Sequence, residues 1–132
     1  MATAVATRVD LLFRAFADPI RLRILRLLQP GELCVCDLVA ALKLPQPTIS
    51  RHLSYLRRAE LVSVREKGSW NFYALAPARS ALHARLIDCL ESSSQEVPEM
   101  VADARRANAA RKQGGRCAVV GRNSGLGTGE LR

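Results

Sequence analysis

The chain has 132 residues, a formal net charge of +8, 48% hydrophobic residues and 5% aromatic residues. This length supports one domain with a modest core, and the sequence has neither an amino-terminal signal pattern nor a run of about 18 apolar residues. The composition therefore argues against a secreted or membrane-spanning protein, and we expect a cytoplasmic protein with no membrane partner.

The positive charge is unevenly distributed. Residues 105–132 contain seven basic residues and one acidic residue, whereas residues 1–104 contain 13 basic and 11 acidic residues. Within this larger part, residues 43–67 carry six basic and two acidic residues. Because a clustered basic surface attracts polyanions, we expect a nucleic-acid-binding surface in this window.

The first two predicted elements are amphipathic helices. Apolar residues recur at the spacing of one helix face in residues 9–16. In the next segment, Asp18 is placed to cap a helix and Pro19 suits its first position. Pro30 and Gly31 end this second helix. Its apolar stripe comprises Ile20, Ile24, Leu27 and Leu28.

A pair of shorter helices is predicted next. Residues 37–43 fit a short helix, which the proline-rich break LPQPT ends. Residues 46–59 fit a second helix, whose inner face carries Ile49, Leu53 and Leu56. Another face carries side chains that donate hydrogen bonds to phosphates or base edges, with Ser50 and Arg58 beside it. The predicted DNA-binding residues of this helix are Thr48, Ser50, Arg51, His52, Tyr55 and Arg58.

Beyond residue 60 the pattern becomes that of a β-hairpin. β-Branched and aromatic residues flank Lys67 and Gly68, where glycine permits a tight turn. Arg65 and Lys67 are placed to contact the DNA backbone. A helical period returns from residue 78 to about residue 90, and Pro98 opens an alanine-rich helix to about Lys112 with little apolar face to bury.

These elements predict a mainly α fold with a β-hairpin. Two short helices separated by a tight break and followed by a basic hairpin are typical of a winged helix-turn-helix. The second short helix alone would more often be an ordinary solvated helix, but the order of the elements favours a DNA-binding unit. We expect residues 1–112 to form one DNA-binding and dimerisation domain, and residues 113–132 to form a flexible, basic, glycine-rich tail.

The four cysteines are Cys34, Cys36, Cys89 and Cys117. Their spacing fits neither a disulfide framework nor a paired-cysteine zinc site, so we expect reduced thiols, which select soft metal ions. Residues i and i+2 of a regular helix point about 200° apart. Cys34 and Cys36 can therefore share one ion only if they straddle the start of the helix near Asp37. Ion binding would then disturb the first turn of that helix.

Three segments of the chain resemble one protein family. ADPIRLRILRLL, GELCVCDL and LPQPTISRHLSYLRRAELVSVREKGSWNFYAL are similar to the ArsR/SmtB family of bacterial metalloregulatory repressors, over about residues 8–92. ELCVCDL resembles the inducer site of the arsenic-responsive members, and the cadmium/lead-responsive members carry a similar string.

The resemblance implies a dimeric winged helix-turn-helix repressor. Such a protein binds an inverted-repeat operator in double-stranded DNA and is released when As(III) or Sb(III) binds its cysteine thiolates, which derepresses an arsenical-resistance operon. The resemblance implies no enzymatic activity, no organic cofactor and no small-molecule substrate. The predicted inducer ligands are Cys34 and Cys36.

The chain departs from the arsenic-responsive pattern at Val39, where many relatives have a third cysteine. Trivalent arsenic favours three sulfur ligands, so the third must come from another cysteine or from a small thiol. Cys117 is a candidate third ligand, because Arg116 beside it favours the thiolate. Cys89 falls on the apolar stripe of residues 78–90, so we expect it to be buried and to have a packing role.

Alternative functions require other features of the sequence. A cadmium/lead-responsive repressor would draw thiols from residues 1–33, which contain no cysteine. A redox-sensing repressor would use oxidation of Cys34 and Cys36 as its signal. A thiol–disulfide enzyme would need a Cys-x-x-Cys motif, and a constitutive DNA-binding protein would need a more basic body. His83 and Asp88 lack the partners of the family's zinc site, so we expect His83 at the surface or at a subunit interface.

Overall fold

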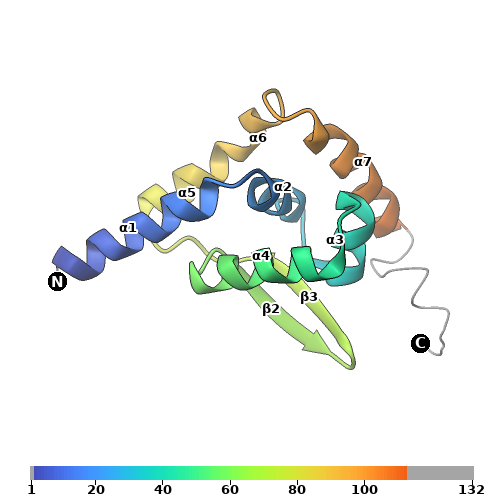
Figure 1. Cartoon of the computed structure of the whole chain (residues 1–132), viewed down its shortest axis with the longest axis horizontal. Coiled ribbons are helices and arrows are strands. Elements are labelled where there is room, and N and C mark those ends of the chain that lie inside the picture. The colour runs from blue at the N-terminus through green and yellow to red at the C-terminus, as the bar shows by residue number, and fades with distance from the viewer. Residues whose placement is uncertain (1, 113–132) are drawn as a thin grey trace.

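The computed structural model describes the backbone of residues 2–112 and the side chains of residues 8–112. Cys117 and the predicted tail of residues 113–132 lie outside the described residues. Within the described part, no helix is long and apolar enough to cross a membrane. Figure 1 shows the helices packed together, with a small β-hairpin extending from one side of them. In chain order the elements are α1 (Ala2–Phe16), α2 (Pro19–Leu28), β1 (Leu33–Cys34), α3 (Val35–Leu42), α4 (Gln46–Arg58), β2 (Val62–Lys67), β3 (Trp70–Leu75), α5 (Ala81–Asp88), α6 (Leu90–Ser93) and α7 (Glu99–Lys112).

Helix α2 begins where the sequence predicts. Asp18 is its N-cap, and the Asp18 carboxylate accepts hydrogen bonds from the backbone N–H groups of Ile20 (2.8 Å) and Arg21 (3.1 Å). Such a cap satisfies donors that the first turn leaves without helical partners. The helix ends at Leu28, ahead of Pro30. Both predicted boundaries of this helix are confirmed.

The core lies between α2, α3 and α4. Apolar side chains from all three helices are fully buried, and each buried leucine or isoleucine contributes about 1.5–3 kcal/mol relative to an exposed one. The predicted inner face of α4 is confirmed. Among the buried residues are Ile24, Leu25 and Leu28 of α2, Leu38 and Leu42 of α3, and Ile49, Leu53 and Leu56 of α4. The core therefore fixes α3 and α4 relative to each other.

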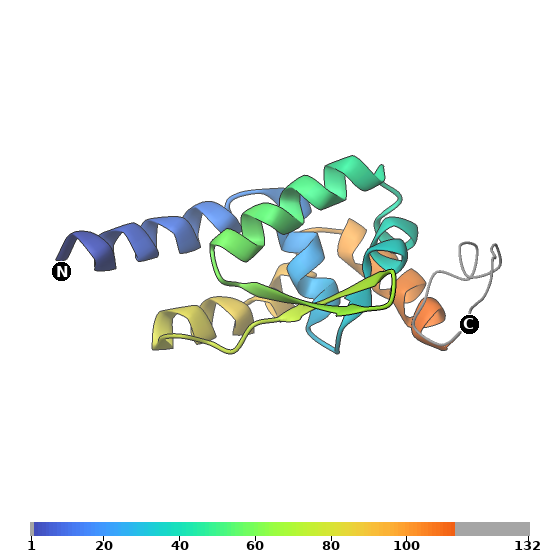
Figure 2. The same cartoon turned by 90° about the horizontal axis from the view of Figure 1, so that it is seen from below.

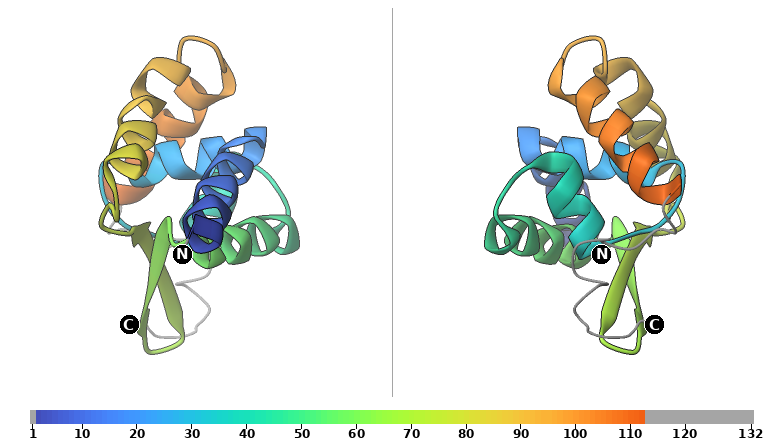
Figure 3. Two further views of the ribbon diagram at one scale, coloured as in Figure 1. Left: turned by 90° about the vertical axis from the view of Figure 1, so that its left-hand side faces the viewer. Right: turned by 90° about the vertical axis from the view of Figure 1, so that its right-hand side faces the viewer.

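The sheet has the strand order β1-β3-β2, with β3 antiparallel to both neighbours. Strands β2 and β3 form the predicted hairpin, and Gly68 adopts φ +62° in its turn. Figure 3 shows this hairpin extending from the body at the opposite side from α6 and α7. Strand β1 was not predicted. It pairs Cys34 with Phe72, so the first cysteine is attached to the hairpin.

Helix α3 starts two residues earlier than predicted. Its N-cap is Cys34, which is extended (φ −80°, ψ 163°) because it pairs with β3. Val35 and Cys36 therefore lie in the first turn, and Asp37 is a buried residue inside the helix instead of its cap. The expectation that the two cysteines straddle a helix start is nevertheless correct.

The carboxy-terminal helices differ from the sequence expectations in two places. The predicted helix from residue 78 to residue 90 is interrupted, and Cys89 lies at the break between α5 and α6, where it is exposed. The expected packing role of Cys89 is therefore wrong. His83 is only 2% exposed, which corrects its expected surface position, and its Nδ1 accepts a hydrogen bond from the Arg79 backbone N–H (3.1 Å).

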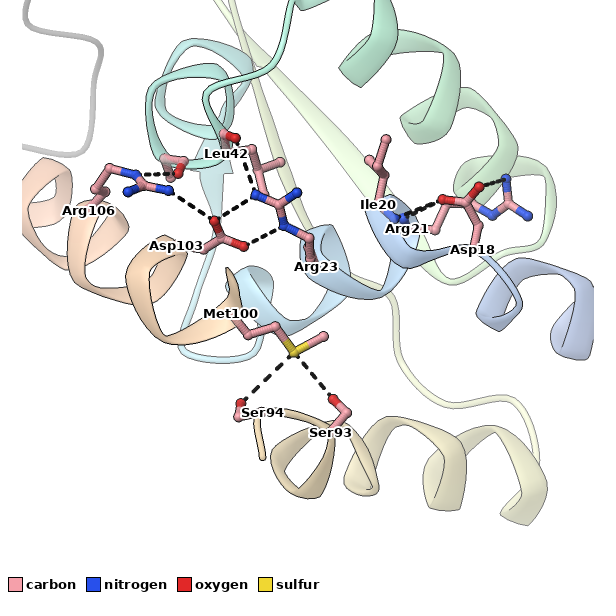
Figure 4. A network of polar contacts seen from close by, with 11 residues as sticks. Asp18, Ile20, Arg21, Arg23, Leu42, Ser93, Ser94, Met100, Asp103 and Arg106 are labelled. Carbon is pink, nitrogen blue, oxygen red and sulfur yellow. Dashed lines mark hydrogen bonds and ion pairs between the residues drawn. The ribbon is translucent and has the colours of Figure 1, made fainter. Parts of the chain in front are cut away.

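Helix α7 has the predicted bounds but buries more than expected. It packs against α2 and α3 and buries Met100, Asp103 and Ala107. Figure 4 shows the Asp103 carboxylate between two arginines. Arg23 donates two hydrogen bonds to it (2.8 and 2.9 Å) and Arg106 donates a third (3.2 Å). These charged hydrogen bonds anchor the helix. They could not be predicted from the pattern of apolar residues.

Candidate DNA interface and thiol site

The exposed face of α4 is basic. The side chains of Arg51, Ser54, Arg57 and Arg58 line an open concavity along this helix, and Ser50 is exposed beside them. Figure 2 shows α4 at the outer edge of the molecule, and the residues of its outer face are exposed. An accessible helix whose outer face carries three guanidinium groups has the charge and shape required to enter the major groove of DNA.

Two of the predicted DNA-binding residues turn toward α2. The His52 Nδ1 lies 3.5 Å from an Arg21 guanidinium nitrogen and 3.9 Å from an Asp18 carboxylate oxygen. The Tyr55 ring packs against guanidinium groups, with its centroid 4.0 Å from Cζ of Arg21 and 5.5 Å from Cζ of Arg58. These cation–π contacts hold Arg58 against the helix. Direct contacts of His52 and Tyr55 with DNA stay predictions. Thr48, in the first turn of α4, is half-buried.

Sequence reasoning missed Ser54 and Arg57 as members of the basic face. Arg57 belongs to the basic window of residues 43–67, but the predicted face follows the spacing of Thr48, Arg51, His52 and Tyr55, all of which can donate hydrogen bonds. The helical spacing from Arg51 to Ser54 and Arg58 carried the correct signal. Amphipathic rings such as that of Tyr55 often pack at the border of a core. The exposed face of α4 therefore lies on the side of Arg51, Ser54 and Arg58.

The hairpin carries the other predicted contacts. Arg65 and Lys67 are exposed on β2. The Arg65 guanidinium forms an ion pair with the Glu32 carboxylate and lies 4.8 Å from the Phe72 ring centroid. The hydrogen bond from Arg65 is the main cause that lowers the pKa of Glu32. The middle of the hairpin is thereby linked to the segment that precedes Cys34.

Cys34 and Cys36 line one cavity. Cys34 is 1% exposed, and Cys36 is half-buried in the first turn of α3. The cavity has a volume of about 200 Å³. Its other lining residues come from three elements: Val35 of α3, Gln46 at the start of α4, and Ser69, Trp70 and Asn71 at the hairpin turn. An occupant of this cavity would therefore contact the cysteine pair, the DNA-facing helix and the hairpin together.

The described residues place Cys89 elsewhere. Its thiol donates a hydrogen bond to the Leu86 carbonyl (3.0 Å) at the end of α5. Within residues 8–112, no group of three or more histidine, cysteine, aspartate or glutamate side chains is arranged to hold a metal ion. Two sulfurs, from Cys34 and Cys36, are the soft ligands that this part of the chain brings to one place.

The carboxy-terminal end of α7 approaches the cysteine segment. The Arg111 guanidinium donates hydrogen bonds to the carbonyl oxygens of Leu27 (3.0 Å) and Gly31 (2.7 Å). Arg106 donates to the Ala41 carbonyl in α3 (2.6 Å). Burial lowers the pKa of Arg111, and the negative charge of Asp37 acts in the opposite direction. The end of α7 is thus attached to the loop that leads into Cys34.

Comparison with known proteins assigns the chain to a family. Residues 18–64 match the family described as "Bacterial regulatory protein, arsR family". The chain is 45% identical over 91 residues to the arsenical resistance operon repressor of Escherichia coli K12, an alignment that covers 68% of this chain and 78% of that protein. The chain belongs to the ArsR family. An uncharacterized HTH-type transcriptional regulator of Methanocaldococcus jannaschii is 47% identical over 78 residues, which cover 58% of this chain and 88% of that protein.

Solved structures support the same assignment. HlyU from Vibrio cholerae superimposes with a TM-score of 0.59 at 34% identity, covering 66% of this chain and 91% of that chain. The predicted winged helix-turn-helix fold and the predicted family are therefore confirmed. The matched members of the ArsR family are transcriptional regulators and not enzymes, so this chain is a DNA-binding regulator.

Proposed function

We propose that this ArsR-family protein is a repressor that binds an inverted-repeat operator as a homodimer and leaves it when arsenite or antimonite binds Cys34 and Cys36. The observation that carries the proposal is the cavity lined by this cysteine pair together with Gln46 of α4 and Trp70 of β3. The similarity to a protein named as an arsenical resistance operon repressor supports the choice of ion.

The proposed operator contact is made by α4 and the hairpin. Arg51, Arg57 and Arg58 face solvent on α4, and Lys67 is exposed near the tip of the hairpin. Inserted into the major groove, α4 would bring these guanidinium groups to bases and phosphates, while the hairpin contacts the flanking backbone. Each phosphate contact releases counterions, so operator binding should weaken steeply as salt increases.

The homodimer is supported by the exposed apolar side chains of α1. Figures 1 and 2 show this helix extending away from the body. Val9 is 37% exposed and Phe13 is 50% exposed, whereas Leu12 on the same helix is buried. A second copy that covers Val9 and Phe13 would remove apolar surface from water and place two α4 helices about a twofold axis.

The proposed switch acts at the start of α3. Cys34 is held extended by its pairing with Phe72, and Cys36 is in the first helical turn. Bonding both sulfurs to one ion changes the geometry of this junction and of the α3–α4 packing behind it. A complete two-state shift requires roughly 5.5 kcal/mol of differential affinity, which is within the range of metal–thiolate binding.

Operator release by arsenite tests the proposal. Fluorescence anisotropy of a labelled operator is followed while arsenite is added to the reduced protein. We expect release of the wild-type protein and of Cys89→Ser, and retention of Cys34→Ser/Cys36→Ser on the operator. Release of the double variant at the wild-type arsenite concentration would contradict the proposal. Cadmium, lead and peroxide in parallel titrations distinguish the other ion-responsive and redox-sensing alternatives.

A further inference from the structure

Arg21 contacts three helices through one side chain. It lies in the first turn of α2, and its side chain is 14% exposed. Its Nε donates a hydrogen bond to the carbonyl oxygen of Ala15 (3.0 Å), and its Nη2 donates one to the carbonyl oxygen of Arg14 (2.7 Å). Both carbonyls belong to the last turn of α1, which is the negative end of that helix and is stabilised by a cation. The guanidinium therefore fixes the end of α1 on α2.

The same guanidinium also contacts α4. Its Cζ lies 4.0 Å from the centroid of the Tyr55 ring, which is a cation–π contact, and its Nη1 lies 3.5 Å from Nδ1 of His52. Figure 4 shows the Arg21 side chain beside Asp18, the N-cap of α2, whose carboxylate lies 4.0 Å from Nη1. One buried cation thus connects the end of α1 with the DNA-facing helix.

Helix α1 is attached to the body near its carboxy-terminal end. Leu12 and Ala15 are buried there, whereas Val9 and Phe13, the residues proposed to meet a second copy, are exposed. Figure 2 shows α1 extending away from the other helices. A helix that is attached at one end turns about that end, so a small rotation near Arg21 displaces the proposed dimer contact by a larger distance. The contacts of Arg21 lie where such a rotation would occur.

We propose that Arg21 is a positioning residue that sets the separation and the angle of the two α4 helices in the dimer, and thereby the spacing of operator half-sites that the protein accepts. This inference rests on the proposed function, because it assumes a homodimer on an inverted repeat. One added base pair moves a half-site by about 3.4 Å along the duplex and turns it by about 34°. A rigid connection between α1 and α4 resists that change, whereas a loose connection follows it.

Binding to operators of different spacing tests this role. Fluorescence anisotropy of the reduced, full-length protein compares the native operator, duplexes with one base pair added or removed between the half-sites, and a single half-site. The wild type should bind the altered spacings about tenfold or more weakly than the native one. Arg21→Met keeps the apolar stem and removes the guanidinium. Its affinities for the three spacings should agree within about twofold, because loosely connected half-sites bind nearly independently. Its affinity for the single half-site should equal that of the wild type.

Two further variants separate positioning from charge and from folding. Arg105→Met removes an exposed arginine from α7 and should keep the wild-type spacing preference. Arg21→Lys keeps the charge, but its ammonium lacks the planar fork that binds two carbonyls and stacks on a ring, so it should also lose the preference. If circular dichroism shows that Arg21→Met is unfolded at the assay temperature, Arg21→Lys takes its place.

A folded Arg21→Met that keeps the wild-type spacing preference would overturn this inference. So would a shallower salt dependence in Arg21→Met than in Arg105→Met, since Arg21 itself would then bind a phosphate. Wild-type protein that binds a single half-site as tightly as the native operator would overturn the proposed dimer and this inference together. The two failures are distinguishable, because the first is seen only in the variants and the second is seen in the wild type.

Discussion

Helix α4 and the segment from Gly31 to Cys36 both contribute residues to the same cavity, through Gln46 and through Cys34 and Cys36, but different forces fix their conformations. α4 has a local apolar period, and its buried face would specify a helix in many contexts. The cysteine segment takes its shape from distant partners: Phe72 pairs with Cys34, Arg65 binds Glu32, and Arg111 binds Gly31. Because these contacts come from other parts of the chain, a ligand that binds the cysteine segment also acts on the hairpin and on α7.

The largest effect should come from removing the anchor of α7. Asp103→Ala leaves the guanidinium of Arg23 without its buried partner and should lower the free energy of unfolding by about 3–5 kcal/mol. Urea denaturation measures this change. Replacing both partners, as Arg23→Met/Asp103→Leu, should recover much of the loss. Equal losses in the single and double variants would show that the charge pair itself is not what anchors α7.

Truncation beneath α4 should have a slightly smaller effect. Leu53 is fully buried, so Leu53→Ala should lower the free energy of unfolding by about 2–5 kcal/mol through lost packing and a cavity. The neighbouring exposed Ser54→Ala is the control and should change stability by less than about 0.5 kcal/mol. Thermal unfolding of both variants compares them. Similar stabilities would contradict the view that the core fixes α4.

Substitution on the outer face of α4 should change binding and not folding. Arg57→Ala should weaken operator binding by about 1–3 kcal/mol. If Arg57 contacts a phosphate, the affinity of the variant should also fall less steeply with salt concentration than the affinity of the wild type. Arg85→Ala, which removes an exposed arginine from α5, is the matched charge control. An equal loss in both variants would indicate a general charge effect instead of a defined interface.

The smallest expected effect is a pH dependence at His83, which lies in α5 and belongs to neither region. Burial, and secondarily the charge of Arg79, lowers the pKa of His83 in the folded protein. The unfolded chain therefore takes up a proton at a pH where the folded chain does not. The contribution of neutral His83 to the free energy of unfolding is complete above about pH 6.5, and it is lost as the pH falls below that value. His83→Gln should unfold with a weaker pH dependence between about pH 7.5 and pH 5, and an unchanged dependence would exclude this role.

The same contrast explains which features could be predicted from the sequence. Helix α2, helix α4 and the hairpin follow from periodicity, from the cap Asp18 and from the turn at Gly68, all of which are local signals. Strand β1 has only two residues, so no alternation marks it, and the early start of α3 depends on its pairing. The packing of α7 depends on Asp103 and Arg23, which are 80 residues apart.

The candidate site shows the same division. The position of Cys34 and Cys36 on either side of a helix start, as two possible ligands of one ion, was predictable from their spacing and from the chemistry of thiols. That Trp70 and Gln46 line the same cavity was not predictable, because the loops that bring them together lie in different parts of the chain. Cys89 was misplaced because the break between α5 and α6 interrupts the apolar stripe at that residue.

Hydrogen exchange with and without arsenite tests the central claim most directly. Exchange is measured by mass spectrometry on the reduced, full-length protein. We predict changed protection in peptides that cover residues 31–42 and 69–73, while the buried face of α4 keeps its protection. Arsenite that releases the operator but leaves exchange in both of those peptides unchanged would contradict the account.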